Sequence, residues 1–115
     1  LNKINEAKAR NNSTDEIYLV HEDMKLNKKL QTLAINGSDV SISQTEFKFL
    51  CYLIHHKDKL IPRDEIVTNV WGENFYITKN NFNTHVSNLR RKIVESIYTI
   101  YAIKGAGIKF SKKEI

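Results

Sequence analysis

The chain contains a single cysteine, Cys51, so no disulfide can form within it. A chain without disulfides is typical of a reducing compartment, and we expect a cytoplasmic protein. No apolar run approaches the ~18 residues of a membrane span, and the first residues show no signal-peptide pattern. Gly-rich phosphate loops, nucleophile motifs, carboxylate pairs and metal-ligand spacings are also missing. These absences argue against an enzyme and predict no cofactor, metal or small-molecule substrate.

Acidic residues are missing from the whole stretch between Thr78 and Val94. Residues 78–113 hold eight Lys and Arg against Glu95 alone, whereas residues 1–77 hold ten basic and eleven acidic residues. Phosphate-binding surfaces have such a composition, because each neutralised phosphate releases condensed counterions. The alternative is a solvated basic surface that keeps the chain soluble.

The acid-poor stretch also has the periodicity of a helix, which we expect from about Thr78 to Glu95. Phe82, Val86, Leu89 and Ile93 recur at offsets of 4, 3 and 4, which places them on one face. The residues that point most directly away from this apolar stripe are small, polar or cationic: Asn80, Thr84, Ser87, Asn88 and Arg91. A helix with a core behind it and donors and cations in front is suited to lie in a DNA groove.

Short strand patterns precede this helix at residues 17–20, 24–26, 30–35 and 40–42. Asn36-Gly37 suits a tight hairpin turn, although the four-residue gap between the last two patterns also allows a looser one. We therefore expect an antiparallel sheet of about four strands. The chain ends with two more strand patterns, at residues 97–103 and 108–111, around a turn that begins with Lys104.

Two further helices are expected in the middle of the chain. Ser43 and Glu46 form a capping-box pattern, and the helix after them runs to about His56. A second helix begins near Pro62, which suits a first helical turn, and ends at Gly72. The order is sheet, three helices and basic hairpin, which describes an α+β winged helix-turn-helix in one domain of modest size.

Four motifs then resemble a known family. They are TEFKFL at residues 45–50, RDEI with VWG at residues 63–66 and 70–72, the helix of residues 81–93, and IKGAGIKF at residues 103–110. In this order and at these gaps the chain is similar to the OmpR/PhoB-type effector domain of bacterial transcription regulators, over about residues 16–112. The resemblance implies sequence-specific binding of double-stranded DNA, with the third helix in the major groove and the hairpin as a wing at the minor groove.

Carried over by position, the resemblance implies a set of DNA-binding residues: Asn80, Asn81, Thr84, His85, Ser87, Asn88, Arg90, Arg91 and Lys104. Asn88 lies where relatives often place an Arg that reads a base, and Asn suits adenine. Arg90 would contact a phosphate, unless it pairs within the chain with Glu65 or Glu95. His85 would also contact phosphate, unless it is a half-buried helix residue. Lys104 would reach the minor groove.

The loop between the second and third helices is a candidate contact for RNA polymerase, through Glu73, Asn74, Phe75 and Tyr76. Phe75 and Tyr76 are alternatively core anchors of the loop, the reading we favour slightly. Several positions depart from the family pattern: Pro62, Asn80, Ser87, Ala102 and Ile108. They leave fewer cations and hydroxyls than many relatives have, so we expect weaker affinity for each half-site, a preference for A·T-rich DNA, and binding as a homodimer on repeated half-sites.

The context of the domain stays open at this point. Residues 1–14 are expected to be a linker or the tail of a preceding domain, and residues 15–113 the winged-helix domain. The helix-like spacing at Leu1 to Ala7 favours the output domain of a two-component response regulator. The alternatives are the DNA-binding domain of a membrane-tethered one-component regulator and a winged-helix module for protein contact.

Overall fold

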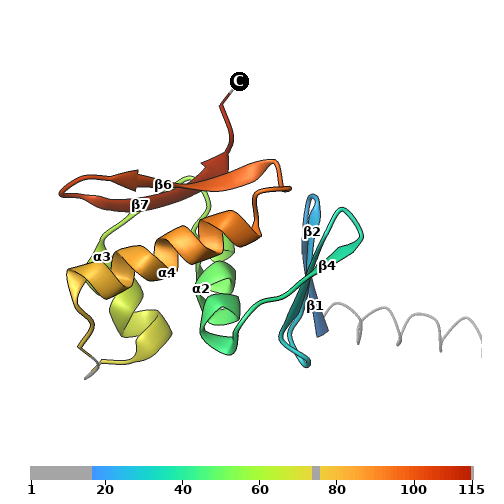
Figure 1. Ribbon diagram of the computed structural model, residues 1–115, viewed down its shortest axis with the longest axis horizontal. Coiled ribbons are helices and arrows are strands. Elements are labelled where there is room, and N and C mark those ends of the chain that lie inside the picture. Colours follow the sequence, from blue (N-terminus) through green and yellow to red (C-terminus); the bar gives the residue numbers. More distant parts are fainter. Residues whose placement is uncertain (1–16, 74–75, 115) are drawn as a thin grey trace, which may run out of the picture.

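Figure 1 shows a computed structural model of the chain, in which residues 17–73 and 76–114 are described. A four-stranded sheet comes first, followed by a group of helices and then a β-hairpin that lies along one side of the last helix. The expected order of elements is confirmed. The expected tail of residues 1–14 lies outside the described residues.

The N-terminal sheet is antiparallel and its strands follow the order of the chain. They are β1 (Tyr18–His21), β2 (Met24–Asn27), β3 (Thr32–Ile35) and β4 (Ser38–Val40). Apolar residues alternate along β2 and β3 and face each other across them, as in the pairs Met24–Ile35 and Leu26–Leu33. This alternation buries one face of the sheet against the helices.

The turn at Asn36-Gly37 is the tight hairpin turn that this pair of residues predicted, not the looser one that the gap between the strand patterns also allowed. Ile35 pairs directly with Ser38, and both central residues have positive φ, at 53° for Asn36 and 83° for Gly37. Strand β4 therefore begins at Ser38 and ends at Val40, so the expectation of a strand over residues 40–42 was wrong. The third strand starts late, at Thr32, because Gln31 before it has a positive φ of 57° in a turn.

Helix α2 (Gln44–His55) has the predicted capping box, in which Ser43 and Glu46 each accept from the other's backbone N–H. The second predicted helix has the expected ends, at Pro62 and Gly72, but it is less regular than expected. It divides into α3 (Arg63–Ile66) and a π-helical turn, η1 (Val67–Trp71), before Gly72 ends it with φ 123°. The pattern of apolar residues does not distinguish these two helical forms.

Helix α4 (Lys79–Lys92) is the predicted third helix, and Thr78 caps it by accepting from the N–H of Asn81 at 3.1 Å. It ends three residues before Glu95, because Ile93 already has the non-helical angles φ −103° and ψ 20°. Phe82, Val86, Leu89 and Ile93 are all at least 96% buried. The predicted apolar stripe is therefore the face that α4 packs against the core.

The wing is part of a three-stranded sheet rather than a lone hairpin. Strands β6 (Tyr98–Ile103) and β7 (Gly107–Lys112) form the predicted hairpin, and β5 (Leu60–Ile61) pairs with β7 on its other side. Two residues are too few to show a strand period, so β5 was not predicted. Tyr98 and Phe110 from the hairpin are fully buried and stack at 5.0 Å, which roots the wing in the core.

Candidate nucleic-acid interface

Helix α4 and the wing lie side by side, with α4 under the hairpin of β6 and β7 (Figure 1). Between them is an open groove of about 720 Å³, lined by residues from both elements and from the start of α3. Four cationic side chains line it: Arg63, Lys79, Arg90 and Lys104. Asp64 is the one acid among the groove residues described. An open concave surface with this charge balance suits a polyanion.

The structure places the predicted DNA-binding residues on two adjacent elements. Eight lie on α4 and Lys104 lies at the turn after β6. The exposed ones are Asn80, Asn81, Thr84, Arg91 and Lys104, and the half-buried ones are His85, Ser87, Asn88 and Arg90. Ser87, Arg90 and Lys104 line the groove itself. None of the nine is sealed inside the core.

Two contacts within α4 order its outer face. The guanidinium of Arg91 donates to the side-chain oxygen of Asn88, one turn earlier on the helix. The hydroxyl of Thr84 donates to the carbonyl of Asn80 at 2.9 Å, so its oxygen keeps the capacity to accept a further hydrogen bond. Because Asn88 and Arg91 hold each other, an amide and a cation are presented together at one place on the helix.

Arg90 is held by the wing rather than by an acid. Its Nε donates to the carbonyl of Ile100 in β6 at 2.8 Å. Neither Glu65 nor Glu95 forms an ion pair with it in the described part of the chain, so the expected alternative was wrong. Glu65 instead accepts from the hydroxyl of Tyr52 at 2.5 Å. The Arg90 contact joins α4 to the wing at the groove that Arg90 lines.

His85 packs against an aromatic cluster behind the outer face of α4. Its ring lies 5.1 Å from that of Trp71 in η1, which in turn lies 5.7 Å from Phe49 and 6.3 Å from Phe82. This arrangement ties the second helical segment to α4. His85 is half-buried.

The predicted site residues do not include three groove residues whose side chains can donate hydrogen bonds, which are Arg63, Lys79 and Asn83. Lys79 and Asn83 are four residues apart and therefore share a face of α4, which the sequence alone indicates. Arg63 begins a different helix and comes beside them only through packing. Its ion pair with the exposed Asp64 is long, at 3.8 Å, so it adds little to stability.

The comparisons with known proteins identify this architecture. Residues 37–110 match the family described as "Transcriptional regulatory protein, C terminal". The chain belongs to this OmpR/PhoB-type family. It is 29% identical over 97 residues to the response regulator SaeR of Staphylococcus aureus, a match that covers 82% of this chain and 42% of SaeR. The chain thus spans less than half the length of that relative.

Solved structures agree with the winged-helix fold of this OmpR/PhoB-type domain. The DNA-binding domain of Klebsiella pneumoniae RstA, solved in complex with the RstA box, matches with a TM-score of 0.70 and 20% identity, over 82% of this chain and 96% of that chain. The DNA-binding domain of Bacillus subtilis CssR matches with a TM-score of 0.64 and 29% identity, over 81% and 98%. In the described residues, no helix is long and apolar enough to cross a membrane.

The loop before α4 differs from one sequence expectation. The side chain of Tyr76 is 84% exposed, so the interpretation of Tyr76 as a core anchor was wrong. Glu73 is exposed as well, while Asn74 and Phe75 lie outside the described residues. Ile77 is the loop residue that packs inward, at 7% exposure. An exposed tyrosine in this OmpR/PhoB-type domain is available to a protein partner.

Proposed function

We propose that this chain is the DNA-binding output domain of a two-component response regulator and that it binds double-stranded DNA in a sequence-specific way. The observation that carries this proposal is the acid-poor outer face of α4, which is backed by the core and shares a cationic groove with the wing. The RstA domain bound to its DNA box and the response regulator SaeR support the assignment. We further propose that residues 15–113 are the winged-helix domain, that residues 1–14 are a linker or a tail, and that the protein acts in the cytoplasm.

In this proposal the major groove is read by α4. Asn88 and Arg91 contact base edges, with an adenine preferred opposite Asn88 because its amide matches the adenine edge with two hydrogen bonds. Asn80, Asn81, Thr84, His85 and Ser87 make further contacts with the DNA, that of His85 being with a phosphate. Arg90 contacts a phosphate, and Lys104 enters the minor groove from the wing tip.

We also propose two partners besides DNA, a second copy of the chain and RNA polymerase. A homodimer would bind two half-sites about one helical turn of DNA apart. RNA polymerase would contact the loop of residues 73–76, where the exposed ring of Tyr76 is available. A membrane-tethered regulator would use the same DNA contacts, so only its upstream and downstream segments distinguish it from a response regulator.

Salt dependence of binding tests the proposal against a winged-helix module that contacts protein instead. Five phosphate contacts predict that log K falls with log salt at a slope of about −4 to −5 for duplex DNA. Selection of bound fragments from random DNA supplies the duplex, and fluorescence anisotropy at several salt concentrations gives the slope.

A matched pair of variants sharpens this measurement. Lys104→Ala should reduce the magnitude of the slope by about one. Lys29→Ala removes the same charge from the turn between β2 and β3 and should leave the slope unchanged. A flat slope, or no binding to any selected duplex, contradicts the proposal and favours the protein-contact module.

A further inference from the structure

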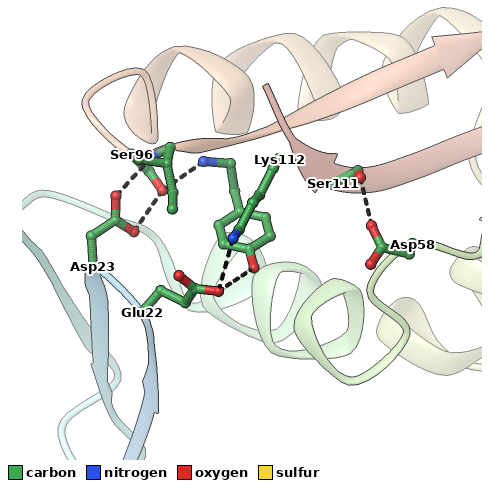
Figure 2. A network of polar contacts seen from close by, with 8 residues as sticks. Glu22, Asp23, Asp58, Ser96, Ser111 and Lys112 are labelled. Atoms are coloured by element: carbon green, nitrogen blue, oxygen red, sulfur yellow. Dashed lines mark hydrogen bonds and ion pairs between the residues drawn. The ribbon is translucent and has the colours of Figure 1, made fainter. Parts of the chain in front are cut away.

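Two turns of the N-terminal sheet meet at the end of the sheet that faces the wing. Glu22 and Asp23 join β1 to β2, and Asn36 and Gly37 join β3 to β4. The N–H of Asn36 donates to the carbonyl of Asp23 at 2.9 Å, so the two turns are joined to each other at this end of the sheet. The two turns lie against residues 94–98, the connection that leads from α4 into β6, as Figure 2 shows for Asp23 and Ser96.

Asp23 uses both carboxylate oxygens on this connection. The hydroxyl of Ser96 donates to Oδ1 at 2.8 Å, and the backbone N–H of Ile97 donates to Oδ2 at 2.7 Å. Ser96 is 2% exposed, and its oxygen also accepts from the N–H of Tyr98 at 3.0 Å. Asp23 therefore holds the backbone of the two residues that directly precede β6.

The neighbouring turn residues extend the same contact. The carboxylate of Glu22 accepts from the hydroxyl of Tyr98 at 2.9 Å and lies 3.5 Å from Nζ of Lys112 in β7. The amide of Asn36 donates to the carbonyl of Glu95 at 3.2 Å. Glu22 makes its contacts from a left-handed backbone with φ 55°, a conformation in which a non-glycine residue with a long side chain is uncommon.

The connection and the root of the wing are joined to each other as well. Lys113, just after β7, donates from its N–H to the carbonyl of Ile97 at 2.8 Å and from Nζ to the carbonyl of Val94 at 2.6 Å. At the other end of the wing, β5 pairs with Ile108 and Lys109 near the tip. The wing is thus held at two ends, and at its root the turns of the N-terminal sheet hold it together with Lys113.

We propose that Asp23, together with Glu22 and Asn36, is a positioning residue that sets the placement of the wing relative to α4. The proposal rests on the proposed function, because it concerns two elements that must contact one duplex at the same time. Asp23 touches no DNA itself. It acts through Ser96 and Ile97 on the connection that leads from α4 into β6. Loosening this connection would let α4 or the wing bind DNA while the other is out of position.

A double-mutant cycle in duplex binding tests this role. Asp23→Asn keeps the size of the side chain but replaces one acceptor oxygen with an NH2 group. This donor would face the hydroxyl of Ser96 or the N–H of Ile97, which are donors to Asp23. Asp39→Asn makes the same charge change at an exposed position of β4 and serves as the control. Each is measured alone and combined with Lys104→Ala, at a temperature at which circular dichroism shows every variant to be folded.

Coupling between the two sites is the deciding result. Lys104→Ala should weaken binding about tenfold in the wild-type and Asp39→Asn chains, but less than about threefold in Asp23→Asn, because the wing is already out of register there. Asp23→Asn alone should weaken binding several-fold although it removes a negative charge. If Asp23→Asn only lowers stability and Asp23 does not position the wing, Lys104→Ala should weaken DNA binding by the same factor in all three chains.

The outcomes separate the two proposals. If the wild-type chain binds no duplex, the proposed function fails. If it binds with the expected salt slope but Lys104→Ala has the same effect in Asp23→Asn as in the wild type, the positioning role is wrong and the function stands. If Asp23→Asn does not fold, Glu22→Gln takes its place in the same double-mutant cycle, because the exposed carboxylate of Glu22 lies at the outer end of the network. Its two possible outcomes are interpreted in the same way.

Discussion

Gly107 lies where the wing passes closest to β5. A Cβ atom at this position would lie 2.1 Å from the carbonyl oxygen of Ile61 and 2.7 Å from its carbonyl carbon, and the backbone has φ 147°. Both facts require glycine, because no side chain can enter that space without moving a backbone. The close approach allows β5 to pair with β7 and hold the wing near its tip.

Gly107→Ala should therefore lower the free energy of unfolding by about 2 to 3 kcal/mol, through the clash and the strained backbone together. Gly105→Ala should cost only about 1 kcal/mol, because Gly105 has φ 77° but no neighbouring atom within 4 Å in the described part of the chain. Urea unfolding of both variants gives the comparison. Equal losses would mean that the contact with Ile61 does not constrain the wing.

At the scale of elements, one carboxylate joins the start of α2 to the end of α4. Oε1 of Glu46 accepts from the N–H of Ser43 at 2.9 Å, which caps α2, and from Nζ of Lys92 at 2.6 Å in the last turn of α4. Glu46 is 6% exposed. Although burial raises the pKa of its carboxyl, the hydrogen bonds from Lys92 and Ser43 outweigh this and lower the pKa below 4.5.

Lys92→Met should lower the free energy of unfolding at pH 7 by about 1 to 2 kcal/mol, because it leaves a buried carboxylate without its cation while Lys92 itself is partly solvated. The lowered pKa means that the ion pair contributes fully above pH 4.5 and is lost as the pH falls through the folded-state value. The difference between the variant and the wild type should shrink in acid. Urea unfolding at pH 7 and pH 3.5 measures it, and an unchanged difference would show that the pair is not the cause.

Elements were predictable to different degrees for identifiable reasons. The capping box at Ser43 lies within one helical turn, and successive residues of the stripe on α4 are three or four positions apart, so residue order alone encodes both. The π-helical turn at Val67–Trp71 and the two-residue strand β5 have no local signal that separates them from an ordinary helix and a loop. Both depend on what packs against them.

At the scale of the whole molecule, His21 marks where the N-terminal sheet docks onto the wing. Its ring lies 4.8 Å from that of Tyr98 and 6.4 Å from that of Phe110. Its Nε2 is buried with no hydrogen-bond partner among the described residues. Burial and the charge of Lys57 lower the pKa of His21 below 6.5, and the nearby Glu22, Asp23 and Asp58 oppose this only in part.

The lowered pKa makes docking of the sheet sensitive to acid. Below pH 6.5 the unfolded chain binds a proton at His21 that the folded chain resists, so stability should fall as the pH drops from about 7 to 5. His21→Phe keeps an aromatic ring on Tyr98 and should reduce this dependence. Thermal unfolding between pH 5 and 8 is the measurement, with His55→Gln on the exposed side of α2 as control. If the stability of His21→Phe depends on pH as much as that of the wild type, other groups cause the dependence.

The sequence by itself determined the local features of this protein: the helix stripe of α4, its acid-free outer face, the capping box of α2, the turn at Asn36-Gly37, and the family motifs. Each is encoded by residues a few positions apart, whose spacing dictates which side chains share a face. Only the tertiary structure decided which distant residues meet, as in Asp23 with Ser96, Glu46 with Lys92, and Arg63 with Lys104 at one groove. Such meetings depend on how whole elements pack, which no local pattern specifies.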